Sequence, residues 1–209
     1  MDASLPTHSF QVRQLVLASS SPRRRDLVES LDLSLPVLIL STDADEQTPA
    51  DWSPSHIVEQ LSLRKARAAV SMLSGQDADR SLIVGADTIV VVDGNVLGKP
   101  ANEREAHAML SLLQGKEHQV YTGVACLETA TGRELIAHRM TRVTMKPLDP
   151  ERIKRYIATG EPMDKAGSYA IQGLGAALVD RLDGCYFNVV GLPVSLLSDM
   201  LSSFGVEVI

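Results

Sequence analysis

The sequence predicts an α/β protein whose β-sheet is mixed rather than purely parallel. Strand-like and helix-like stretches alternate along the chain, which is typical of this fold class. Two turn signals, Asp93-Gly94 and Thr131-Gly132, each join apolar, β-branched runs into a hairpin. Because hairpins pair strands antiparallel, we expect antiparallel neighbours within the sheet.

The first half of the chain is expected to alternate strands and helices. The strands are short apolar runs bounded by turn residues. Two helices begin at Ser-Pro pairs, because serine caps free N–H groups and proline fits the first helical turn. An acidic loop, Asp43–Pro49, precedes the second helix. In order, these elements are strand Leu15–Ala18, helix Pro22 to about Leu31, strand Pro36–Leu40, helix Pro54 to about Leu73, strand Leu82–Val92 returning along Asn95–Lys99, and helix Ala101–Leu113.

The second half is expected to open with a hairpin and to close with a helix. A short helix from Pro150 ends before Gly160, since glycine terminates helices. A glycine-rich stretch that contains Gly167, Gly173 and Gly175 leads to the last expected strand. The expected elements are strands Val120–Leu127 and Leu135–Met145, helix Pro150–Ala158, a strand near Ala177–Leu182 and helix Gly191–Phe204.

Composition excludes a disordered chain, a collagen-like fibre and a coiled coil. The 209 residues are 44% apolar and 22% charged, an ordinary globular mix for one or two domains. The longest apolar runs are far shorter than the roughly 20 residues that cross a bilayer, so we expect no membrane span. If the chain forms two lobes, the weakest junction lies near Lys146–Asp149.

Charge and cysteine usage narrow the partners and the compartment. A net charge of -6 disfavours broad binding to nucleic acid, and only 4% of residues are aromatic. Residues 1–14 lack the basic and apolar regions of a signal peptide. Cys126 and Cys185 lie far apart, which argues against a metal knuckle or a disulfide framework. We therefore expect a reduced, cytoplasmic protein.

An arginine cluster at a helix start is a candidate phosphate site. Ser19-Ser20-Ser21-Pro22 leads into Arg23, Arg24 and Arg25. A helix start already carries partial positive charge and free N–H groups, so an anion would relieve the crowding of cations. The alternative is three solvated arginines. Arg24 precedes Leu27 and Val28 by three and four positions, so it lies on the same, core-facing side of the helix. Its side chain should therefore point toward a cleft or a sheet edge.

A lysine and a carboxylate occupy otherwise apolar patterns. Lys65 falls on the apolar face of the helix that is expected from Pro54 to about Leu73. Its ammonium group either extends to solvent at the rim of that face or meets a buried anion. Asp87 interrupts the apolar strand and is a candidate general base or metal ligand, because such groups often sit where strands end. The alternative is a structural carboxylate paired with a lysine. The apolar face comprises Ile57, Leu61, Ala68, Ala69 and Met72.

Two further segments offer polar groups. Asp45 and Glu46 in the acidic loop suit a hard divalent cation, although such a loop is more often solvated. The hairpin returns Lys99 toward the strand that carries Asp87. Gln172 in the glycine-rich stretch presents a donor and an acceptor together, suited to the edge of a base, although glycine richness alone is also typical of an Ω-like loop.

Taken together, the motifs resemble the Maf family of nucleoside triphosphate pyrophosphatases. Their order and spacing match over roughly 14–205. The resemblance implies an elongated mixed α/β fold with a central cleft, similar to inosine triphosphate pyrophosphatases, over a single domain 14–209 with a flexible tail at 1–13. The motifs are Leu17-Ala18-Ser19-Ser20-Ser21-Pro22-Arg23-Arg24, Lys65-Ala66, Gly85-Ala86-Asp87-Thr88, Gly98-Lys99-Pro100, Tyr121-Thr122-Gly123-Val124, Asp164-Lys165-Ala166-Gly167-Ser168-Tyr169, Ile171-Gln172-Gly173 and Val190-Gly191-Leu192-Pro193.

The resemblance also implies an activity and residue roles. The family hydrolyses a nucleoside triphosphate to the monophosphate and pyrophosphate with a divalent metal, magnesium or manganese, and its members suggest a homodimer. Asp87 matches the proton acceptor, and Glu46 with Asp87 the acidic positions near the metal. Arg23, Thr88 and Gln172 match the branch that acts on dTTP and UTP. The phosphate-binding positions are Ser19, Arg24, Lys65, Lys99 and Lys165.

Three functions follow from these residues. The first is a pyrophosphatase for dTTP, UTP or modified pyrimidine triphosphates. The second is a broad or purine-type nucleotide pyrophosphatase. The third is a non-enzymatic nucleotide-binding regulator of cell division, which needs the cations but not Asp87. The presence of Asp87 and Glu46 favours an enzyme.

Overall fold

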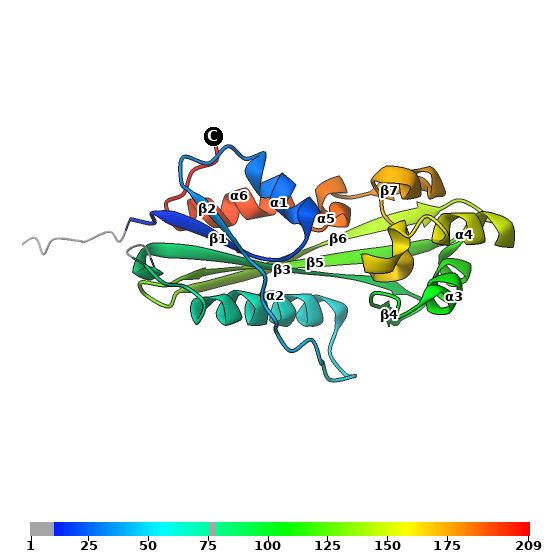
Figure 1. The fold of residues 1–209 in the computed structure, drawn as a ribbon, viewed down its shortest axis with the longest axis horizontal. Helices are drawn as coiled ribbons and strands as arrows, with labels where there is room; N and C mark the ends of the chain where they lie inside the picture. The colour runs from blue at the N-terminus through cyan, green and yellow to red at the C-terminus, as the bar shows by residue number, and fades with distance from the viewer. Residues whose placement is uncertain (1–10, 76–77) are drawn as a thin grey trace, which may run out of the picture.

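The computed structural model describes residues 11–75 and 78–209. Within these residues, a single seven-stranded sheet runs along the molecule. The strands are β1 (Gln14–Ala18), β2 (Val37–Leu40), β3 (Ser81–Val92), β4 (Asn95–Leu97), β5 (Glu117–Glu128), β6 (Glu134–Met145) and β7 (Val179–Asp183). Their order is β2-β1-β3-β5-β6-β7, with β4 also paired to β3 (Figure 1). The pairs among β2, β1 and β3 are parallel and the others are antiparallel, which confirms the mixed α/β class.

The helices begin largely where the sequence predicts. The Ser21 and Ser53 hydroxyls accept N–H groups of the first turns that follow them, as helix caps. No helix in the described part of the chain has the length and apolarity to cross a membrane. The α-helices are α1 (Pro22–Glu29), α2 (Pro54–Val70), α3 (Glu103–Leu113), α4 (Pro150–Ile157), α5 (Tyr186–Val190) and α6 (Val194–Ser202), and the 3₁₀ turns are η1 (Ala78–Arg80), η2 (Glu161–Asp164), η3 (Ala166–Ser168) and η4 (Gly173–Leu178).

The glycine-rich region and the C-terminal region differ from prediction. The helix expected over Gly191–Phe204 is present as α6 but begins only at Val194, after Pro193 at its N-cap position. The short helix α5, which ends at Gly191 with φ of +124°, was not predicted. The glycine-rich stretch contains successive 3₁₀ turns, and the last of them, η4, delays the start of β7 to Val179. Helix α2 ends at Val70, so Met72 lies beyond it and is exposed rather than part of its apolar face.

Helices cover both faces of the sheet. Helix α2 lies along one face, and α1 and α6 lie on the other (Figure 1). The α2 backbone touches β3 and β5 directly, because Gly85 and Gly123 leave no side chain between them. A Cβ on Gly85 would lie 2.8 Å from Ala66 N, and one on Gly123 would lie 2.8 Å from Glu59 N. The face of α2 against the sheet therefore includes small residues such as Ala66, as well as the larger apolar ones that spacing predicts.

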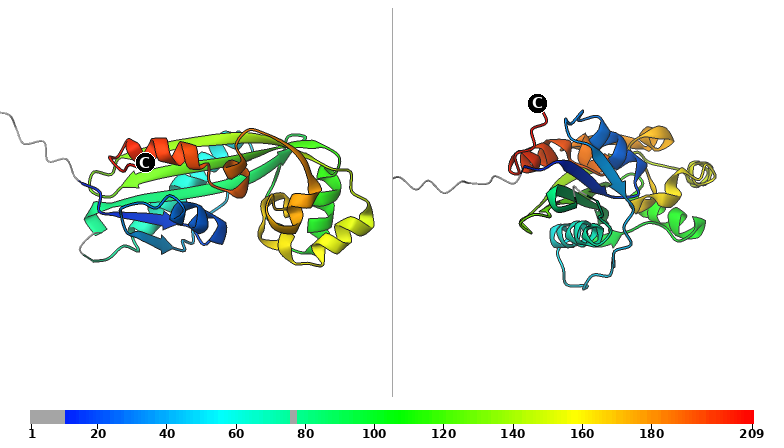
Figure 2. Two further views of the ribbon diagram at one scale, coloured as in Figure 1. Left: turned by 90° about the horizontal axis from the view of Figure 1, so that it is seen from above. Right: turned by 60° about the vertical axis from the view of Figure 1, so that its left-hand side comes forward.

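The two ends of the molecule have separate apolar clusters joined by the same long strands. Helices α3 and α4 pack with η3 around buried side chains that include Leu110, Ile153 and Tyr169. The other end packs α1 and α6 against the sheet around Val28 and Leu197. Strands β3, β5 and β6 run through both ends (Figure 2).

Candidate active site

The site lies at an interruption along one edge of β3. Pairing with β1 stops where Ala18 faces Gly85, and pairing with β4 begins where Leu97 faces Val90. Residues 86–89 therefore have no strand beside them on this edge within the described residues. Asp87 lies in the middle of β3, so the strand that ends at the site is β1, not the strand that carries the carboxylate. Such a strand end is a common place for ligands in α/β proteins.

A cavity of about 590 Å³ opens at this interruption, between the two ends of the molecule. Its volume falls within the range of small-molecule sites. The described residues lining it include five cationic and three acidic side chains, so its local charge opposes the net charge of the chain. All ten predicted site residues line it: Ser19, Arg23, Arg24, Glu46, Lys65, Asp87, Thr88, Lys99, Lys165 and Gln172.

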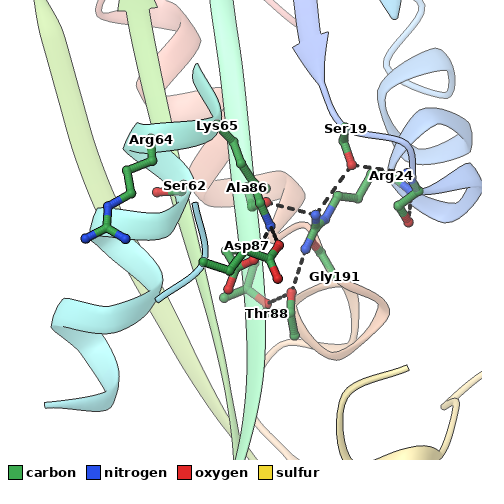
Figure 3. Close-up of polar contacts among 12 residues, drawn as sticks. Ser19, Arg24, Ser62, Arg64, Lys65, Ala86, Asp87, Thr88 and Gly191 are labelled. Atoms are coloured by element: carbon green, nitrogen blue, oxygen red, sulfur yellow. Dashed lines mark hydrogen bonds and ion pairs between the residues drawn. The ribbon is translucent and has the colours of Figure 1, made fainter. Parts of the chain in front are cut away.

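Arg24 closes the interrupted edge (Figure 3). Its guanidinium donates to Gly191 O at 2.7 Å, to Ala86 O at 2.8 Å and to Thr88 Oγ1 at 3.0 Å. A longer contact of 3.4 Å reaches Ser19 Oγ. Burial lowers the pKa of Arg24, and the nearby Asp87 carboxylate opposes that shift. Most of the N–H donors of Arg24 are thus bonded to protein oxygens, and its positive charge lies in the wall of the cavity.

Lys65 joins the two predicted carboxylates. Its Nζ lies 2.5 Å from Asp87 Oδ1 and 2.8 Å from Glu46 Oε1. Lys65 and Asp87 are nearly buried, with 14% and 11% of their side chains exposed, whereas Glu46 lies toward solvent. The hydrogen bond from Lys65 lowers the pKa of Glu46, despite opposing desolvation. The side chains of Glu46 and Asp87 therefore meet at a single lysine, and that lysine favours the ionised form of Glu46.

The close approach of α2 puts Lys65 at this position. Gly123 on β5 faces Asp87 across the strands, and Gly85 precedes Asp87 by two residues on the same face. These two glycines let the backbone of α2 lie directly on the sheet. The neighbouring Arg64 points away from Asp87 (Figure 3). Its guanidinium donates to Asp45 O at 3.1 Å and Gln47 O at 2.6 Å, which holds the acidic loop on both sides of Glu46.

Asp87 and Thr88 serve opposite faces of β3, because successive side chains on a strand alternate. Asp87 meets Lys65 of α2, and Thr88 meets Arg24 of α1. The Thr88 hydroxyl also contacts Thr122 Oγ1 at 2.9 Å, and Thr122 donates to Asn188 O at 2.9 Å. A continuous polar chain therefore links Arg24 to α5.

The opposite wall of the cavity comes from the end that contains α3 and α4. Arg23 reaches across to Asp164 Oδ2 at 3.4 Å, and Lys165 Nζ lies 2.6 Å from Asp164 Oδ1. Lys99 follows the end of β4 by two residues and is exposed. Its positive charge is close enough to Glu46 to help lower the pKa of that carboxyl group. Gln172 is exposed at the N-terminus of η4, where its side chain makes no capping hydrogen bond to the described residues.

The two carboxylates that Lys65 contacts are oxygen ligands of the kind that a hard divalent cation takes. Among the described residues, no group of three or more His, Cys, Asp or Glu side chains converges as a complete metal site. Two carboxylates do converge, those of Glu46 and Asp87. Magnesium is usually held by one or two carboxylates, with phosphate oxygens and water completing its shell. The pair therefore suits a metal that arrives with a phosphorylated ligand.

Sequence reasoning missed several residues that organise the site. Arg64 carries no local signal, since an arginine on a helix is common. Thr122 lies in one of the family motifs, but its motif did not indicate what the side chain contacts. Glu161 has no predicted role, although its carboxylate accepts the backbone N–H groups of Leu174 and Gly175. Only their long-range partners show what these side chains do.

The fold and the cavity define an α/β protein with a cavity rich in cationic side chains, next to a pair of carboxylates. The family model described as Maf-like protein matches residues 14–204. The chain belongs to this Maf family. A dTTP/UTP pyrophosphatase from Pelotomaculum thermopropionicum is 52% identical over 198 residues, 95% of this chain and 100% of the relative. One from Desulforamulus reducens is 48% identical, with the same coverage of both chains.

Proposed function

We propose that this protein hydrolyses dTTP and UTP to the monophosphate and pyrophosphate. The observation that carries the proposal is the Glu46–Lys65–Asp87 cluster inside a cavity lined by five cations among the described residues. The names of the similar Maf proteins support the reaction and the pyrimidine substrates. Modified pyrimidine triphosphates fit the same chemistry.

The cations suit a triphosphate. Such a chain carries about four negative charges near neutral pH, which arginine and lysine donors neutralise through charge-assisted hydrogen bonds. We assign Lys65, Lys99 and Lys165 to the phosphates, together with the Ser19 hydroxyl. Arg24 would contribute mainly its charge, because its donors hold the edge of β3.

In the proposed reaction, a water oxygen bonds to the α-phosphorus, and the bond from this phosphorus to the α–β bridging oxygen breaks. Pyrophosphate leaves with that oxygen. Asp87 would orient the attacking water or accept its proton. A divalent metal held by Glu46 and Asp87 would, when bound, neutralise phosphate charge and lower the pKa of water. Lys65 would keep the two carboxylates together and stabilise charge on the phosphates.

Three residues are proposed to select the base. Gln172 can present a donor and an acceptor to a pyrimidine edge. Thr88 and Arg23 lie on two walls of the same cavity, where they would limit the space beside the nucleotide. The purine-type pyrophosphatase and the non-enzymatic regulator remain the alternatives, and neither has a specific observation in its favour.

The role of Asp87 is tested by Asp87→Asn. The amide keeps the shape but is a poor base, so we expect turnover of dTTP to fall by at least about 100-fold. Asp93→Asn is the matched control, because Asp93 is an exposed acid in the turn after β3 that pairs with Lys116 at 3.0 Å. Normal turnover in Asp87→Asn would exclude its catalytic role. Binding without hydrolysis of any triphosphate by the unaltered protein would favour the regulator.

Base selection is tested by Gln172→Glu with a panel of dTTP, UTP, GTP and ATP. Glutamate removes the amide donor, so we expect kcat/KM to fall for the pyrimidines relative to the purines by about tenfold. Unchanged ratios would reject the assignment of Gln172. Purine preference in the unaltered protein would favour the purine-type pyrophosphatase.

We also propose that the protein is cytoplasmic, works as a homodimer and comprises one domain over 14–209. The free thiols of Cys126 and Cys185 are compatible with a reducing compartment. Sedimentation equilibrium tests the dimer. Most of the tail proposed at 1–13, residues 1–10, lies outside the described residues.

A further inference from the structure

The loop that carries Gln172 is held at both sides by two side chains outside it. Before Gln172, the N–H of Ala170 donates to the Tyr156 hydroxyl at 3.1 Å. After Gln172, the N–H groups of Leu174 and Gly175 donate to the Glu161 carboxylate at 2.9 and 2.8 Å. The loop is therefore fixed through its backbone, and the Gln172 side chain is left at the cavity.

Glu161 and Tyr156 act as one unit. The Tyr156 hydroxyl donates to Glu161 Oε1 at 2.9 Å, so the carboxylate accepts three hydrogen bonds. Burial acts to raise the pKa of Glu161, but the donors from Gly175, Leu174 and Tyr156 outweigh it and lower that pKa. The carboxylate is thus ionised at neutral pH, which strengthens each of these hydrogen bonds.

Two glycines make room for this unit. A Cβ on Gly173 would lie 2.6 Å from Glu161 Oε2, and Gly173 also has a φ of +65°. A Cβ on Gly175 would lie 2.5 Å from the Tyr156 hydroxyl oxygen. The loop thus packs its bare backbone directly on these two side chains.

We propose that Glu161, supported by Tyr156, is a positioning residue that sets base selectivity by holding the Gln172 loop against the cavity. Glu161 does not line the cavity and acts through the loop. This inference rests on the proposed function, in which Gln172 reads the base. It assigns the selectivity of the site to a carboxylate outside it.

Glu161→Gln is the sharpest variant. An amide has the size of the carboxylate but only one acceptor oxygen. Its NH₂ group would face one of the two backbone N–H groups of the loop, so the hydrogen bond to that N–H would be lost. One side of the loop is therefore released. We expect the ratio of kcat/KM for dTTP to kcat/KM for GTP to fall about tenfold, the change that corresponds to roughly one hydrogen bond. Tyr156→Phe removes the hydroxyl that joins both sides of the loop, and we expect a change in the same direction.

The control and a double variant separate positioning from a structural effect. Glu151→Gln changes an exposed acid on α4 that pairs with Lys154 at 2.8 Å, and it should leave the ratio unchanged. If Glu161 acts through Gln172, Glu161→Gln should change the ratio in the native background but not in Gln172→Ala. Hydrogen exchange at the amides of Leu174 and Gly175 should quicken in Glu161→Gln and stay slow in Glu151→Gln.

The outcomes distinguish this inference from the proposed function. An equal loss for both nucleotides, or the same change of ratio in both backgrounds, would overturn the positioning role while leaving the pyrophosphatase intact. If the unaltered protein hydrolyses neither nucleotide, the proposed function fails. The positioning role is then measured by equilibrium binding of non-hydrolysable dTTP and GTP analogues, and an unchanged binding ratio in Glu161→Gln would reject it.

Discussion

Gly85→Ala should separate the two charged groups at the centre of the site without altering either of them. The new Cβ would lie 2.8 Å from Ala66 N and closer still to Ser62 O, both in the backbone of α2. A backbone cannot rotate away as a side chain can. Helix α2 must therefore withdraw by roughly 1 Å to restore van der Waals contact. Lys65 lies between these two residues in the same helix turn and would move with them.

The size of the effect follows from that displacement. Overpacking at a buried contact typically costs about 1–3 kcal/mol of the free energy of unfolding. A misplacement of about 1 Å in a catalytic group lowers turnover by about 100-fold. We therefore expect a moderately destabilised protein with a far larger loss of kcat/KM for dTTP than its stability explains.

The assay compares urea unfolding with dTTP hydrolysis at a temperature where each variant is folded. Leu201→Ala is the control, because Leu201 is a fully buried residue of α6 in an apolar cluster that does not line the cavity. It should cost about 2–5 kcal/mol of stability yet keep its turnover. Full activity in Gly85→Ala would refute the reasoning that the close approach of α2 places Lys65 on Asp87.

Two more predictions concern groups outside the catalytic cluster. Burial lowers the pKa of His118 from 6.5 to about 4, so the folded protein keeps it neutral while the unfolded chain protonates. The free energy of unfolding should fall by about 3 kcal/mol as the pH drops from about 6.5 to about 4, and urea titrations of His118→Gln should lack that part of the slope. Arg64→Ala should release the acidic loop and raise the magnesium concentration for half-maximal activity about tenfold. The control is Arg67→Ala, because Arg67 lies on the exposed side of the same helix and pairs with Glu134 at 2.7 Å. This control variant should leave the magnesium concentration for half-maximal activity unchanged. An equal rise of that concentration in both variants would contradict the role of Arg64.

Local sequence was sufficient for much of the fold. The Ser-Pro helix starts at Ser21 and Ser53 and the hairpin at Asp93-Gly94 formed as expected, because capping and turn chemistry act over a few residues. The helix expected over Gly191–Phe204 formed as α6, but three residues later than expected, because Gly191 ends the preceding α5 and Pro193 is the N-cap residue of α6.

Residue type and local pattern were enough to identify the candidate site residues, but they did not predict how these residues pair in space. Apolar patterns interrupted by Lys65 and Asp87 indicated that both side chains needed a partner, but two alternatives stayed open for each. The structure pairs them with each other. The signal that could have suggested this is the glycine at 85, which allows a helix to approach the strand beside Asp87.

The amino-acid sequence was therefore enough to predict the helices and strands, where most of them begin, and which side chains are unusual in an apolar pattern. Tertiary structure alone decided that β1 stops and β4 starts on either side of Asp87, leaving an open edge for the cavity. It also decided that Arg24 meets Gly191, 167 positions away, and that Glu161 holds the Gln172 loop. The physical reason is the range of the interactions: capping and periodicity act within a few residues, whereas strand order and helix approach depend on the packing of the whole chain.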